Sequence, residues 1–155
     1  MSEYIFDQLA FARNATLAAA KDLSESEADF VPQGLNNNIR WNLGHIYLIQ
    51  ERFALQFAQE PTEVPEGFAD LFASGTKPAE WKTQAPTLAE LVKLLTEQPQ
   101  RIREKLTNRL TEKVANPLTI GSLKLDTIGA LLTFSLLHEG MHQQNIKNLR
   151  KLSGK

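Results

Sequence analysis

The sequence predicts an all-α protein whose helices form one four-helix bundle. Helix-period patterns of apolar residues dominate four stretches of the chain, and they are the main evidence for this fold class. A length of 155 residues suits a single domain, expected to span residues 1–155, which can bury a core without disulfides. Cysteine is absent, so neither a disulfide framework nor a thiolate metal site competes with this interpretation.

The first two helices are predicted from contrasting patterns. In the first, apolar or small residues recur at alternating steps of four and three, which places them on one helical face: Ile5, Leu9, Ala12, Thr16, Ala19 and Leu23. The second, from about Ile39 to Ala58, is apolar on several sides. We therefore expect the second helix to be the more buried of the two.

The third predicted helix begins at Thr87, because Thr87 and Glu90 have the spacing of a capping box. Its apolar face extends through Leu88, Leu91, Leu95, Ile102 and Leu106. Pro99 interrupts this stretch and predicts a kink or a break, since proline removes one intrahelical donor and its ring collides with the preceding turn.

The fourth helix is expected to run to Arg150 from Asp126 or Thr127, either of which suits an N-cap. Just before it, residues 118–125 alternate around a Gly-Ser pair and predict a small β-hairpin. The connection between the second and third helices, residues 60–86, contains four of the seven prolines and an apolar cluster: Phe68, Leu71, Phe72 and Trp81. A connection of this length suggests a lid over a site.

Composition excludes several classes of function. With 17 Lys and Arg against 18 Asp and Glu, mixed along the chain, no basic stripe indicates nucleic-acid binding. The N-terminal stretch has no basic head followed by an apolar run, and nowhere do 18 consecutive apolar residues occur, so we expect a cytoplasmic protein without a membrane partner. Without cysteine, any thiol chemistry must use a thiol brought in from outside.

The three histidines of the chain are the candidate metal ligands. His138 and His142 are four residues apart on the fourth helix, so both rings can reach one ion at about 2.0–2.1 Å. Alternating steps of four and three place them in a predicted inward-facing row: Leu131, Ser135, His138, His142, Asn145, Leu149 and Leu152. Imidazole competes with protons near a pKa of about 6.5, which predicts metal loss toward about pH 5.

His45 is the third candidate ligand. It lies in the second helix with Trp41, Leu48, Ile49 and Arg52 on its own side, and we expect it to point into the bundle. Together the three predict a site for one divalent ion, zinc or nickel in the first place and iron or manganese in the second. The alternative is that the histidines are hydrogen-bonded core residues.

Residues 138–142 also match the H-E-x-x-H pattern of zinc peptidases, in which the glutamate activates water. Those enzymes draw a third ligand from further along the chain, but only 13 residues follow His142 and none is His, Asp or Glu. We therefore interpret Glu139 as a solvated residue or a partner of a ligand. No catalytic or cofactor-binding residue is assigned beyond the three ligands.

Neighbours of the ligands have two interpretations each. Gly44 and Gly140 permit either close helix approach around an ion or relief of crowding in an apolar core. Arg52 is interpreted as a helix-end residue or as a partner for an anionic substrate. Trp41 and Tyr47 are interpreted as core residues or as pocket walls.

Two segments resemble the signature segments of the DinB-like (DinB/YfiT-like) superfamily: residues 39–46, which contain His45, and residues 138–146, which contain His138 and His142. The resemblance implies a four-helix bundle of DinB-like type, a metal ion on these three histidines, and a homodimer. Family members with assigned activities include thiol-dependent transferases and isomerases. The chain departs from the family by having Gln144 and Asn145 before Ile146, so no role is carried over to residue 145.

Three functions remain open at this point. The resemblance favours a metal-dependent transferase that uses a low-molecular-weight thiol of the bacillithiol type, acting on a small-molecule substrate. An ion on three neutral imidazoles also suits a hydrolase, because it lowers the pKa of bound water. The third function, from a different class, is a non-catalytic binding protein braced by its metal.

Overall fold

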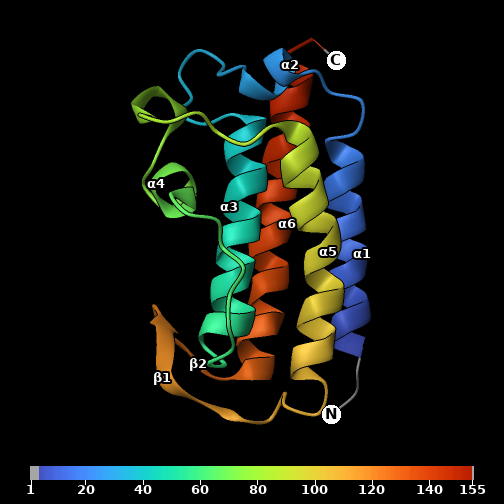
Figure 1. Ribbon diagram of the computed structural model, residues 1–155, viewed down its shortest axis with the longest axis vertical. Helices are drawn as coiled ribbons and strands as arrows, with labels where there is room; N and C mark the ends of the chain where they lie inside the picture. The colour runs from blue at the N-terminus through green and yellow to red at the C-terminus, as the bar shows by residue number, and fades with distance from the viewer. Residues whose placement is uncertain (1–3, 155) are drawn as a thin grey trace.

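Four long helices lie side by side along most of the molecule (Figure 1). The computed structural model describes residues 4–154. The predicted all-α class is correct in its main feature, a mostly helical chain with one small sheet. The long helices are α1 (Tyr4–Ala19), α3 (Ile39–Glu51), α5 (Leu88–Leu106) and α6 (Ile128–Leu152).

Helices α1 and α3 each pack against both α5 and α6. In Figure 1, α1 and α6 run upward whereas α3 and α5 run downward, so α3 and α6 are antiparallel neighbours. Short elements fill the connections: α2 (Glu25–Asp29), the π-helical turn η1 (Arg52–Gln56), α4 (Phe68–Phe72), the 3-10 turn η2 (Pro78–Glu80), β1 (Lys113–Ile120) and β2 (Leu123–Thr127).

The starts of the helices follow from capping side chains. Thr87 and Glu90 form the predicted capping box at α5, with the hydroxyl of Thr87 accepting from the backbone N–H of Glu90. Of the two predicted N-caps for α6, the structure uses Thr127, whose hydroxyl accepts from the backbone N–H of Ala130. Asn38 caps α3 in the same way and so fixes where the helix that carries His45 begins.

Pro99 does not break α5, which continues from Leu88 to Leu106. A proline at position 99 leaves the carbonyl of Leu95 without its usual helical donor. The guanidinium of Arg13, on α1, supplies the missing donor, with Nη1 2.8 Å from the Leu95 oxygen. The helix therefore passes through the proline because a neighbouring helix completes its hydrogen bonding.

The buried face of α1 differs from the predicted one. Its buried residues are Phe6, Leu9, Arg13 and Thr16. Ile5, Ala12 and Ala19, which the pattern placed on the inner face, are only half-buried, and the helix ends before Leu23. The difference arises because a buried arginine occupies the face, which a search for apolar residues does not detect.

The connection between α3 and α5 runs along the outside of α3, past α4 on the left of Figure 1. The side chains of Phe68, Leu71 and Phe72 are buried against the core of α3, and Trp81 is half-buried there. The predicted apolar cluster thus packs on α3. It forms a wall beside His45, because the backbone oxygen of Phe72 contacts that ring.

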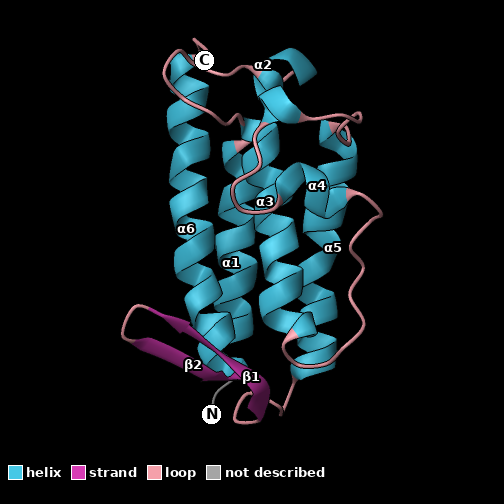
Figure 2. Cartoon of the chain, turned by 90° about the vertical axis from the view of Figure 1, so that its left-hand side faces the viewer, coloured by secondary structure: helices cyan, strands magenta, loops and turns pink. Residues whose placement is uncertain are grey.

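The predicted hairpin is present at one end of the helices (Figure 2). Strands β1 and β2 are antiparallel, with Ile120 opposite Leu123, and the turn between them is the Gly121-Ser122 pair. Gly121 has φ 59°, a left-handed conformation that glycine adopts without steric cost. Within residues 4–154, no helix combines the length and apolar character needed to span a membrane.

Candidate metal centre

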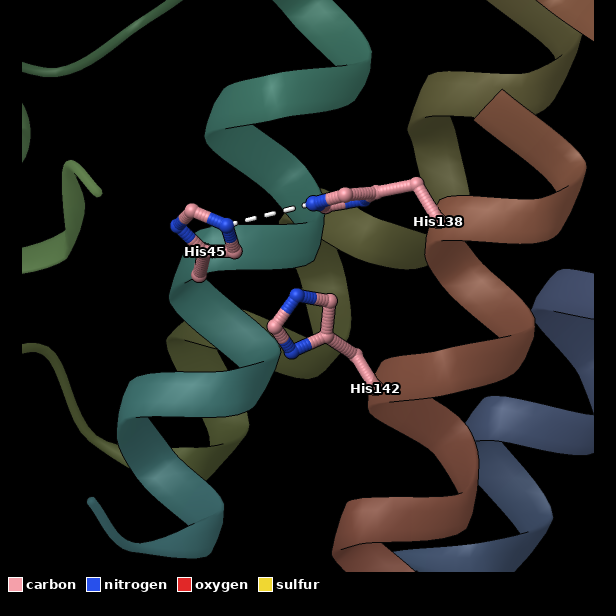
Figure 3. A group of neighbouring side chains, drawn as sticks. All are labelled: His45, His138 and His142. Carbon is pink, nitrogen blue, oxygen red and sulfur yellow. Dashed lines mark hydrogen bonds between the residues drawn. The ribbon is translucent and has the colours of Figure 1, made fainter. Parts of the chain in front are cut away.

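Three imidazole rings meet between α3 and α6 (Figure 3). His45 comes from the middle of α3, and His138 and His142 come from successive turns of α6. One ring nitrogen from each residue lies within 4.8 Å of the other two. The structure thus brings together the three histidines that the sequence singled out, although 93 residues separate His45 from His138.

Hydrogen bonds orient two of the three rings. Nδ1 of His45 is 2.7 Å from the backbone oxygen of Phe72. Because a carbonyl only accepts, Nδ1 must carry the proton, and the lone pair is left on Nε2. Nδ1 of His142 is 2.8 Å from Oδ1 of Asn42. The amide nitrogen of Asn42 donates to the Asn38 carbonyl, so Oδ1 is the acceptor and His142 also keeps its lone pair on Nε2.

The spacing of one pair of these nitrogens matches that of two ligands on a shared ion. Two nitrogens bound at about 2.0–2.1 Å in a tetrahedral arrangement are about 3.3–3.4 Å apart. The Nε2 atoms of His45 and His138 are separated by 3.2 Å. Hydrogen bonding alone would join these two rings and leave Nε2 of His142 without a protein partner among the described residues. The donor set therefore fits a divalent ion.

Aromatic side chains enclose the centre. Trp41 stacks on His45, with ring centroids 4.5 Å apart and planes 12° from parallel. Its indole N–H donates to Oγ1 of Thr76, which ties the ring to the connection after α4. On the other side, the ring of Phe53 lies edge-on to His138 at 6.2 Å between centroids. Trp41 is thus both a core residue, 6% exposed, and a wall of the site.

Burial keeps the rings neutral. It lowers the pKa of His138 to about 3 and that of His142 to about 4, and in both cases the charge of neighbouring imidazoles lowers the pKa further. Burial also lowers the pKa of His45, although its bond to Phe72 opposes the shift. Neutral imidazole is the form that binds metal. We therefore expect the protein to retain its metal at a lower pH than the ordinary histidine pKa of about 6.5 predicts.

Without metal, the protein is expected to lose stability steadily as the pH falls from about 6.5 to about 4. In that window the unfolded chain protonates these histidines, whereas the folded state excludes the protons from His138 and His142 until about pH 3 and about pH 4. The measurement is the free energy of unfolding in urea at a series of pH values. His138→Gln should flatten the profile, and an unchanged slope in that variant would contradict this origin.

Gly44 is required by a close approach of α4. A Cβ at this position would lie 2.5 Å from Cε1 of Phe72, well inside van der Waals contact. The glycine therefore lets Phe72 reach α3, and this places the Phe72 carbonyl on His45. Gly140 has no such role, since a Cβ there would meet no atom within 4 Å.

Gly44→Ala is expected to destabilise the fold by about 1–3 kcal/mol through overpacking and to weaken metal binding by displacing the carbonyl that orients His45. Urea unfolding and metal titration measure the two effects. Gly140→Ala is the matched control, because alanine in an open helical position should stabilise α6 by up to about 1 kcal/mol. Equal responses of the two variants would show that the contact with Phe72 is unimportant.

Glu139 lies away from the centre, which corrects its interpretation as a solvated residue or a ligand partner. Its carboxylate is buried, 2% exposed, and accepts two bonds from Arg13, at 2.8 Å from Nε and 3.2 Å from Nη2. Thr16 donates a third at 2.9 Å. A carboxylate held in this way by α1 cannot activate water at the histidines, so the peptidase interpretation is wrong for Glu139.

The predicted row on α6 is also wrong in two places. Asn145 and Leu152 are exposed, and Ile146, outside the row, is buried, whereas Leu149 is buried as predicted. His138 and His142 are half-buried at the edge of the inner face. Arg52 is exposed at the start of η1, with its guanidinium carbon 5.8 Å from the centroid of the Phe57 ring.

Sequence reasoning missed two residues that orient the site. Asn42 precedes His45 by three residues on α3 and holds His142. A polar residue one turn before a ligand in an apolar helix was the available signal for it. Phe72 acts through its backbone oxygen, and no side-chain pattern identifies a backbone acceptor.

These features define a class of protein: a helical protein with a candidate three-histidine metal centre between two antiparallel helices. A family model for the DinB superfamily matches residues 8–146, and the chain belongs to that superfamily. The match extends from α1 to α6 and spans all three histidines, so the family assignment suggested by the two segments is confirmed. No curated protein matches the chain.

Proposed function

We propose that the protein is a metal-dependent transferase that joins a low-molecular-weight thiol to an electrophilic small molecule. The observation that carries the proposal is the convergence of three neutral nitrogens, with His45 and His142 each held by a bond on Nδ1. His45, His138 and His142 would hold one divalent ion, with zinc or nickel favoured. When bound, such an ion keeps its full positive charge and lowers the pKa of a coordinated thiol.

The protein's own residues hold the ligand nitrogens in place and cover one side of the site. The Phe72 carbonyl and Asn42 fix the rings of His45 and His142, so little reorganisation is needed when substrate arrives. The stacked ring of Trp41 covers one side of His45. Because the chain has no cysteine, the sulfur nucleophile must belong to a substrate.

The proposed reaction is a substitution at carbon. The thiol sulfur forms a bond to the electrophilic carbon, the bond from that carbon to its leaving group breaks, and the leaving group departs with the electron pair. The thiol proton is released to solvent. No external oxidant or reductant is needed, and no protein side chain is modified.

A hydrolase is the second candidate, since the same centre could lower the pKa of water. Glu139 is the only acidic residue of the H-E-x-x-H segment. Because it is buried and paired with Arg13, it is not available to activate that water. The third candidate is a protein that binds metal without catalysis. Activity measurements separate the three candidates.

The test begins with elemental analysis of protein purified without an affinity tag. The metal-bound protein is then mixed with bacillithiol, mycothiol or glutathione and monobromobimane, and conjugate formation is followed by chromatography. His138→Ala should reduce the rate to the uncatalysed level. Gln144→Ala, an exposed change on the same helix, should not. A metal-loaded parent protein that accelerates no conjugation, or full activity in His138→Ala, would refute the proposal.

A homodimer belongs to the same proposal. It is supported by large apolar side chains exposed on the adjacent helices α1 and α6: Tyr4, Phe11, Leu137 and Met141. Phe11 is 78% exposed and Leu137 is 59% exposed, and such side chains on neighbouring helices are typical of an interface. Sedimentation equilibrium of the parent and of Phe11→Ser would test this part, with a monomeric parent as the contradicting result.

A further inference from the structure

A groove of about 850 Å³ lies one helical turn along α3 from the candidate metal centre. Leu48 and Ile49, which follow His45 by three and four residues, line one side of it. Ala69 and Ala73 line the other side and flank Phe72, whose carbonyl holds His45. The groove and the centre therefore share two supporting segments, α3 and the segment that contains Phe72.

Within residues 4–154, Arg52 is the cation lining the groove that has no ion-pair partner. Glu51 is paired with Arg101, with 2.7 Å between Oε1 and Nη2, and Glu60 is paired with Arg109, with 2.5 Å between Oε1 and Nη1. Both glutamates line the groove as members of ion-pair networks, since Arg101 also contacts Glu63, Lys105 also contacts Glu60, and Arg109 also contacts Glu112. Arg52 lines it as well and, within residues 4–154, its side chain forms no ion pair and no hydrogen bond.

The position of Arg52 strengthens this interpretation. Its guanidinium carbon is 5.8 Å from the Phe57 ring, so the group is placed by an aromatic face and its N–H donors remain available. Arg52 also borders a smaller adjoining cavity with Gln56, Phe57 and Asn116. An apolar lining of Leu48, Ile49 and Ala73 beside the Arg52 guanidinium suits a ligand with an apolar part and a carboxylate.

We propose that this groove binds a small carboxylate-bearing ligand, with its apolar part over Leu48 and Ile49 and its carboxylate on Arg52. The inference rests on the proposed function in one respect, namely that the natural ligand is the thiol or the electrophile used at the histidines. Binding itself requires no metal, because none of the histidines lines the groove.

The probe is S-hexylglutathione, which carries two carboxylates and an apolar chain and whose blocked sulfur cannot act as a thiolate. Its binding to the full-length protein is measured by isothermal titration calorimetry. Arg52→Gln is expected to weaken binding about tenfold, a modest loss because the guanidinium is exposed. Lys93→Gln, which removes a positive charge from an exposed position on α5, is the matched control and should bind like the parent.

The dimethyl ester of the probe keeps its shape and its amine but lacks both carboxylates, so it should bind as weakly as the probe binds Arg52→Gln. Equal affinity of parent and Arg52→Gln, equal affinity for probe and ester, or no binding by the parent would each overturn the inference. His138→Ala separates the two proposals, since it should lose thiol transfer and retain probe binding. Loss of probe binding in that variant would place the ligand at the histidines and not in the groove.

Discussion

His45→Ala is expected to abolish stoichiometric metal binding. His45 is the only one of the three candidate ligands on α3, and without it the two remaining imidazoles come from successive turns of one helix. Loss of a partner that merely orients a ligand costs about 10–100-fold in metal affinity, so loss of the ligand itself should cost more than about 100-fold. Elemental analysis after dialysis and competition with a chelator measure the change.

Asn145→Ala is the control for this variant, because Asn145 was predicted on the same inner row as the histidines and the structure shows it exposed. It should bind metal like the parent. Circular dichroism establishes that both variants are folded. A folded His45→Ala protein with a full equivalent of metal would show that the ion, if present, is held elsewhere.

Arg13→Ala is expected to destabilise the protein by about 3–5 kcal/mol, because it leaves the buried carboxylate of Glu139 without its counter-charge. The side chains of Arg13 and Glu139 are 3% and 2% exposed, so solvent cannot compensate for the loss. The same change removes a donor from Gln98, whose Oε1 is 2.9 Å from Nη1 of Arg13. The measurement is the free energy of unfolding in urea.

Arg103→Ala is the matched control, since its ion pair with Asp7 is exposed and should contribute less than about 1 kcal/mol. Glu139→Gln supplies a second test, because it removes the charge and keeps the shape. If that variant folds, it should retain metal and any thiol transfer. Similar stabilities of Arg13→Ala and Arg103→Ala would mean that the buried pair contributes nothing beyond a surface pair.

The long helices and the histidine cluster were predictable from the sequence for a simple reason. Helical spacing of apolar residues reports which face is buried, and His138 and His142 share a face whatever the rest of the fold does. His45 could be added because it was the only other histidine and lay in the most apolar stretch. What remained open was the direction of each ring, which depends on Asn42 and Phe72.

The errors on α6 have a geometric cause. Alternating steps of four and three average 3.5 residues per turn, whereas a straight α-helix has 3.6, so the predicted row drifts by about 20° every seven residues. Over the 25 residues of α6 this drift moves the row from the buried Leu131 to the exposed Asn145 and Leu152. The structure instead buries Ile146, the neighbour of Asn145, and it also buries Leu149, which the row had included.

Because of Pro99 in α5, the effect of a substitution at position 13 in α1 depends on which residue is present at position 99. With Pro99 present, the Leu95 carbonyl relies on Arg13 for its donor, so loss of the arginine also costs this bond. With alanine at position 99, the backbone could supply that donor, and replacing Arg13 should be less harmful by about 1 kcal/mol. The order of substitutions therefore matters: a lineage can give up the proline first at little cost, whereas losing the arginine first carries the greater penalty.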